Sequence, residues 1–199
     1  MSMKDNKAFS EVIESSLQGW LAQCWQWNEF PAFGSLLCIK TKNRTLFGIV
    51  HQIQTGSMDP MRYPFAYKKT HEQLLQEQPQ IFEFLKTTYS CLTIGYQEKA
   101  KMYYMVAPEP PAIHSFVEPI QKDLAKQFFA SQQFLPLLFG LSNQVFNLDE
   151  LLLALLKQQQ SLGILSAEKL HTFIDTFSLM SANDYRRTKL FAQRVQHLL

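Results

Sequence analysis

The chain has 199 residues, enough for one domain of ordinary size or for a barrel of about 100 residues with a smaller helical partner. Hydrophobic residues make up 46% of the chain and charged residues 18%, a globular composition that argues against intrinsic disorder. Nineteen basic and seventeen acidic residues give a net charge of +2, so the overall field does not indicate a nucleic acid or an anionic membrane as partner. Any such site would have to be local.

The cysteines and the apolar runs indicate the cellular compartment of the protein. Cys24, Cys38 and Cys91 are odd in number and widely spaced, which predicts neither a disulfide framework nor a zinc site and indicates a reducing compartment. The N-terminal segment carries charges of both signs without the apolar centre of a signal peptide, and the longest apolar-rich run, 134–141, is far below the roughly 20 residues of a membrane span. We therefore expect a cytoplasmic protein with no membrane partner.

Residues 9–27 fit two structures. Their apolar residues fall at helical spacing and favour an amphipathic helix: Phe9, Val12, Ile13, Leu17, Trp20, Leu21, Cys24 and Trp25. The alternative is two strands, 8–15 and 20–27, that meet at a turn at Gln18 and Gly19, and the glycine, the β-branched pair and the tryptophans favour it. The pattern alone leaves both structures open.

The segment 34–56 predicts a hairpin of barrel type. Two runs rich in Leu, Ile, Val and Phe, at 35–40 and 45–54, flank the polar break 41–44. Gly48 interrupts the second run, and a glycine inside a strand marks a bulge or a close backbone approach that bends a barrel strand.

A helical insertion is expected after this hairpin. Thr70 and Gln73 form a capping box, and Pro79 is well placed to open a second helix, so residues of about 70–87 form a two-helix insertion between strands. The β pattern then returns at 89–96 and 101–107.

The last part of the chain is helical in pattern. Four residues at 108–111, three of them prolines, mark the clearest boundary in the sequence. Helices are expected within 122–138, after the caps Asn147 and Ser166, and from about residue 184 onward. The expected fold class is α+β: a small, mostly antiparallel β-barrel with a two-helix insertion, followed by a helical C-terminal region.

The order of these features resembles the HAS barrel, the β-barrel domain named for the HerA helicase-like ATPases and the ATP synthase subunits. The matching segments are 11–14, 33–39, 46–50, 93–96 and 108–111, and together they cover roughly residues 8–120. The resemblance favours strands over a helix at 9–27. It implies a β domain at 8–112, with its helical insertion, and an α-helical domain at 113–199.

The resemblance implies an assembly role, because in such proteins the barrel precedes an ATPase core and helps to form a ring. This chain departs from the pattern: it has no GxxxxGK[ST] loop, and no glycine is followed by lysine. No ATPase activity is therefore carried over. We expect a non-enzymatic interaction or assembly module, associated with an ATPase or nucleic-acid-processing complex, whose partner is another protein or a second copy of the chain.

The loop 62–70 is the strongest local candidate for a binding site. It combines cations that suit phosphate with flat rings that suit base stacking, as single-strand binders do: Arg62, Tyr63, Phe65, Tyr67, Lys68 and Lys69. Nucleic-acid binding by this loop is the second hypothesis. The alternative is a loop whose aromatic side chains cover the barrel and whose lysines are solvated.

Enzyme chemistry is the third hypothesis. His51, Asp59 and Arg62 lie within twelve residues and could supply a general base, but no activated nucleophile is near in sequence. No metal-binding spacing such as HxH, HExxH or CxxC links His51, His71, His114, His171 and the cysteines. We assign no catalytic, cofactor-binding or metal-binding residue.

Overall fold

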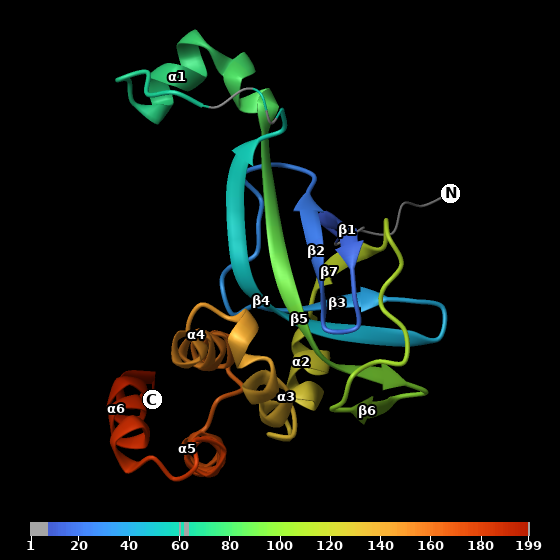
Figure 1. The fold of residues 1–199 in the computed structure, drawn as a ribbon, viewed down its shortest axis with the longest axis vertical. Coiled ribbons are helices and arrows are strands. Elements are labelled where there is room, and N and C mark those ends of the chain that lie inside the picture. The colour runs from blue at the N-terminus through green and yellow to red at the C-terminus, as the bar shows by residue number, and fades with distance from the viewer. Residues whose placement is uncertain (1–7, 60, 62–63, 199) are drawn as a thin grey trace.

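The computed structural model describes residues 8–59, 61 and 64–198, and its fold is α+β (Figure 1). The described residues form a sheet with the strand order β2-β1-β7-β3-β4-β5-β6. Additional pairing of β2 with β5 closes the first six strands of that order into an antiparallel barrel, and β6 is an extra strand on β5. The predicted fold class is confirmed. The strand bounds are β1 (Ser10–Ser15), β2 (Gly19–Cys24), β3 (Leu36–Lys40), β4 (Arg44–Ser57), β5 (Leu85–Glu98), β6 (Lys101–Tyr103) and β7 (Phe116–Pro119).

Residues 9–27 form the strand pair and not the helix. In β2 the side chains of Trp20, Ala22 and Cys24 are buried while their neighbours in the strand are partly exposed, which is the alternation of a half-buried strand. The helical alternative is wrong because both strands carry apolar residues on more than one face, which imitates helical spacing.

Gly48 has the structure predicted for it. The register between β4 and β5 shifts between Phe47 and Gly48, which is a bulge. The indole ring of Trp20 lies against this backbone, and a Cβ at residue 48 would come within 2.1 Å of it. Only glycine fits there, because the large ring fills the barrel interior over a bent strand.

The barrel continues past the boundary expected at residue 112. β7 pairs with β1 and with β3, so it supplies a wall of the closed barrel from within the segment expected to be helical. A strand of four residues that ends in a proline has no clear signal of its own in the sequence.

Helices form the insertion and the C-terminal region. The insertion holds α1 (His71–Glu77) and the 3₁₀ helix η1 (Pro79–Phe84), and the capping box at Thr70 and Gln73 is present as predicted. Asn147, Ser166 and Asp184 cap the three longer C-terminal helices through their side chains. The bounds after the barrel are α2 (Lys122–Phe128), α3 (Leu135–Gly140), η2 (Ser142–Gln144), α4 (Leu148–Ser161), α5 (Ala167–Met180), α6 (Tyr185–Val195) and η3 (Gln196–Leu198).

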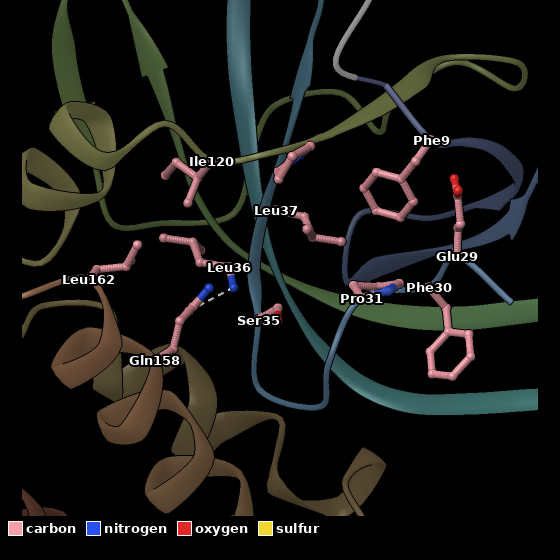
Figure 2. Close-up of a pocket in the computed structure, with 11 residues that line it drawn as sticks. Phe9, Glu29, Phe30, Pro31, Ser35, Leu36, Leu37, Ile120, Gln158 and Leu162 are labelled. Atoms are coloured by element: carbon pink, nitrogen blue, oxygen red, sulfur yellow. Dashed lines mark hydrogen bonds between the residues drawn. The ribbon is translucent and has the colours of Figure 1, made fainter.

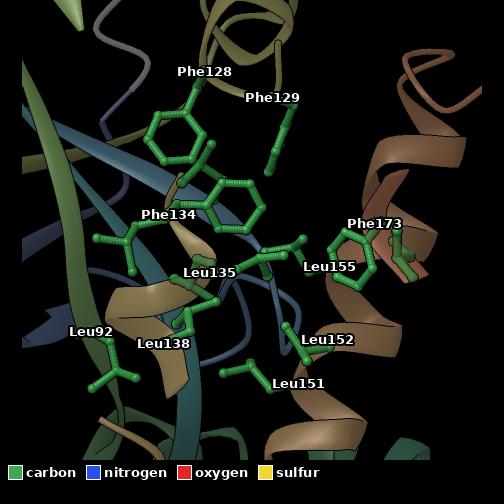
Figure 3. Close-up of a cluster of buried hydrophobic side chains, with 14 of the residues drawn as sticks. Leu92, Phe128, Phe129, Phe134, Leu135, Leu138, Leu151, Leu152, Leu155 and Phe173 are labelled. Atoms are coloured by element: carbon green, nitrogen blue, oxygen red, sulfur yellow. The ribbon is translucent and has the colours of Figure 1, made fainter. Parts of the chain in front are cut away.

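The C-terminal helices and the barrel share one apolar core (Figure 3). Leu92 from β5 lies in the same cluster as Phe134 and Leu138 around α3 and Leu152 and Leu155 from α4. The leucine stripe predicted on α4 is therefore core. A second cluster, which includes Trp20 and Val50, fills the interior of the barrel.

Candidate protein-interaction arm

The β4–β5 ribbon extends beyond the barrel, and it is free over a longer stretch on the β4 side than on the β5 side, where β2 pairs with β5 as far as Thr88. On the β3 side, the last backbone bonds to β4 join Val50 to Gly34 and Ser35, at 2.8 and 3.0 Å. β4 and β5 stay paired as far as Ser57 and Leu85. Figure 1 shows the ribbon standing out from the barrel and carrying α1 at its far end. We call residues 52–87 the arm, and α1 with η1 the head.

The head has almost no core of its own. Neither α1 nor η1 contains a buried residue. A helix of seven residues is marginal in water, so its stability must come from its cap and from contacts outside itself.

Trp27, in the loop between β2 and β3, supplies such a contact. Its ring stacks on Phe82 at a centroid distance of 5.5 Å and meets His71 edge-on at 6.1 Å. The hydroxyl of Thr87, which is opposite Thr55 in the ribbon, donates a hydrogen bond to the carbonyl oxygen of Trp27. One aromatic side chain from the barrel therefore helps to hold the head.

The arm exposes large apolar side chains. Among its described residues, Met61 is 89% exposed and Phe65 69%, and Met58, Leu75 and Phe84 are also exposed. Single exposed apolar residues are ordinary, but a group of them on one projecting element is typical of a surface that binds a partner.

The loop 62–70 lies on this arm. Arg62 and Tyr63 fall outside the described residues. The rings of Phe65 and Tyr67 contact each other at 4.3 Å, and Lys69 is ion-paired with Glu77 of α1. Lys68 is exposed and has a left-handed backbone, with φ of 57°. Phe65 therefore packs on Tyr67 and remains largely exposed.

The charge of the arm does not favour a polyanion. Residues 52–87 contain four basic and four acidic residues, a net charge of zero with histidine neutral. Phosphate binding depends on an excess of cations. The acidic residues of the arm offset the positive charge of the loop, so the arm has no such excess.

The structure separates His51 from Asp59, two of the three residues considered as a catalytic site. The six residues from His51 to the end of β4 at Ser57 span about 20 Å of extended strand, so Asp59 lies far from His51. His51 instead lines a pocket of about 240 Å³ with Glu14, Ser90 and others, and burial lowers its pKa.

His114 and His171 each lie beside a carboxylate, and the cysteines are buried. His114 pairs with Glu11, and His171 lies 3.6 Å from Asp175. Within the described residues, no group of three or more His, Cys, Asp or Glu side chains is arranged to hold a metal ion. The three cysteines are buried free thiols, and burial raises the pKa of Cys24 and of Cys38 to about 11.

A groove that the sequence did not reveal lies where the barrel meets α4. Its volume is about 400 Å³, and Figure 2 shows its lining side chains. Phe9, Pro31, Ile120 and Leu162 give it apolar walls, and Gln158 accepts a hydrogen bond from the backbone N–H of Leu36 at 2.9 Å. Its residues come from four distant parts of the chain, so no local motif marks it.

The fold and the arm define the class of protein: a closed β-barrel with packed C-terminal helices and a projecting β-ribbon arm. No protein-family model and no curated protein matches the chain. Among the helices of the described residues, none has the length and apolar content to cross a membrane.

Proposed function

We propose that the protein is a non-enzymatic interaction and assembly module of the HAS-barrel type, cytoplasmic, whose arm binds a protein partner. The observation that carries the proposal is the head, which projects from the barrel, has no buried residue and exposes apolar side chains. The resemblance of the sequence segments at 11–14, 33–39, 46–50, 93–96 and 108–111 to the HAS barrel supports a partner within an ATPase or nucleic-acid-processing complex.

Burial of the exposed apolar side chains would stabilise the complex with a partner. Covering a large apolar side chain stabilises an association by about 1.5–3 kcal/mol before the costs of binding are subtracted. Met61, Phe65 and Leu75 make few contacts within the chain at their exposed surfaces. A protein surface with an apolar pocket is the occupant that would gain most from them.

Partner capture from the native cell tests this function. The wild-type chain is compared with the triple variant Met61→Ser/Phe65→Ser/Leu75→Ser, and with Phe146→Ser/Leu179→Ser as a matched control. Phe146 and Leu179 are also highly exposed but lie outside the arm. We expect a partner that the wild type and the control recover and the triple variant loses. Equal recovery by all three chains would refute a role for the arm.

Nucleic-acid binding by the loop 62–70 is the second candidate, supported by the exposed ring of Phe65 beside Tyr67 and Lys68. Its test is salt-dependent binding to single-stranded DNA or RNA, with Lys68→Glu/Lys69→Glu expected to reduce both the affinity and the salt dependence. Absence of binding at low salt would end this candidate.

A further inference from the structure

The outer edge of β4 is unpaired along the arm. Met58 donates its backbone N–H to Phe84 at 2.7 Å, which makes this pair a hydrogen-bonded one. Because such pairs alternate along an antiparallel ladder, the backbone groups of Gln52, Gln54 and Gly56 also face β5. Those of Ile53, Thr55 and Ser57 then face outward. In the described part of the chain, no backbone group bonds to that side of β4 beyond Val50.

This edge lacks the features that keep exposed strands apart. Natural edge strands are protected by charged side chains, prolines or complete cover. From Thr45 to Met58 the sequence of β4 and its end contains no Asp, Glu, Lys, Arg or Pro. Its titratable residue, His51, is held toward the neutral form, since burial lowers its pKa. The bulge at His51 lies at the base of the arm and leaves the outer stretch regular.

The absence of charge indicates which strand fits. A strand that pairs with its own copy places each residue opposite a residue of the same segment, so any charge near the centre would repel itself. A segment without charge is compatible with its own copy, whereas selecting a charged foreign strand would call for opposite charges on this edge.

We propose that β4 pairs antiparallel with β4 of a second copy of the chain, about a twofold axis at Thr55. This inference rests on the proposed assembly function and names one partner for it. With Thr55 opposite its counterpart, Ile53 of each copy is opposite Ser57 of the other, and about six backbone hydrogen bonds join the two edges. The pairing is isologous and therefore closes as a dimer.

The position of the arm also sets where the two barrels would lie in this pairing. The ribbon projects from the barrel, so antiparallel arms carry the two barrels at opposite ends of the shared sheet (Figure 1). Each head then lies near the base of the other arm. Ser35, which bonds to Val50 at that base, also lines the apolar groove at the junction with α4. The exposed Met58 and Phe65 of one copy would approach the groove of the other.

Sedimentation equilibrium of the full chain over a concentration series tests the dimer. Thr55 is exposed and lies at the twofold axis, so Thr55→Lys and Thr55→Glu each place like charges face to face. We expect a wild-type dimer, a dissociation constant raised roughly tenfold or more in each variant alone, and recovery of the dimer when the two variants are mixed. Asn43→Lys and Asn43→Glu, in the turn just before β4, are matched controls that should remain dimeric.

Each outcome decides the proposal. A wild-type monomer throughout the concentration series overturns it, as does a dimer that neither Thr55 variant weakens. Weakening in both variants without recovery on mixing overturns the twofold axis at Thr55. Thermal unfolding of each variant verifies that its arm is folded, and both variants lose the Thr55–Thr87 hydroxyl contact equally. Capture of another protein by an arm that stays monomeric would leave the proposed function standing without this inference.

Discussion

Arg187 on α6 binds the carboxylate of Asp149 in the first turn of α4 with two hydrogen bonds, of 2.6 Å from Nη2 to Oδ1 and 3.2 Å from Nε to Oδ2. The guanidinium also lies 5.3 Å from the ring centre of Phe177 on α5. One side chain thus ties together three helices. The positive charge concentrated near the C-terminus is partly committed to holding the helical region closed.

Asp149→Asn should lower the free energy of unfolding by about 1 kcal/mol. The pair is bidentate but partly exposed, so its contribution lies between that of a surface ion pair and that of a buried one. Chemical denaturation measures the change. Glu168→Gln, which removes a carboxylate from the first turn of α5, is the control and should cost less than about 0.5 kcal/mol. Equal losses would show that only the helix dipole matters.

Gly48→Ala should destabilise the barrel by about 1–3 kcal/mol, because the new methyl group would overlap the Trp20 ring inside a packed core. Gly56→Ala is the matched change on the same strand. No atom lies within 4 Å of a Cβ at residue 56, so its effect should be neutral or stabilising by less than about 1 kcal/mol. Thermal unfolding of both variants compares them, and a tolerated alanine at residue 48 would contradict the close approach.

Trp27→Ala should loosen the head and leave the barrel intact. The mutation removes the stacking contact with Phe82 and the edge contact with His71, each of which stabilises by about 0.5–1.5 kcal/mol. Amide hydrogen exchange in α1 and η1 should rise about two- to tenfold. The control is Trp25→Ala, whose ring contacts Phe116 on the barrel and should leave exchange in the head unchanged.

His51 should make the protein less stable in mild acid. Burial favours the neutral imidazole and lowers its pKa in the folded state below the ordinary value of 6.5. The unfolded chain then binds the proton first. The contribution is full above pH 6.5 and declines as pH falls below 6.5 toward the folded-state pKa. Denaturation between about pH 7.5 and 5.5 should show a smaller slope for His51→Gln than for wild type, and equal slopes would contradict the prediction.

Local signals in the sequence predicted much of the fold. The capping box at Thr70, the caps at Asn147 and Ser166 and the bulge at Gly48 each depend on a few neighbouring residues, and all are present. β7 could not be predicted in this way, since it pairs with β1 across more than one hundred positions of the sequence and with β3 across about eighty. Closure of the barrel is a long-range property.

The sequence predicted only part of the candidate arm. The helical insertion and its aromatic and basic residues were predicted, but not the length of the ribbon that carries them. β4 runs to Ser57 and β5 begins at Leu85, so each strand is fourteen residues long. Glycine and polar residues at the end of β4 read as a turn, and the pairing partner that keeps them extended lies about thirty residues away.

β4 and β5 are continuous strands that run from the arm into the barrel wall, so the ribbon connects the head directly to the barrel. A torque applied at the head is delivered to the strand that carries Leu92 and Ile94, which lie in the core shared with the C-terminal helices. A partner bound to the head would therefore be connected, through β5, to the junction between the barrel and the C-terminal helices.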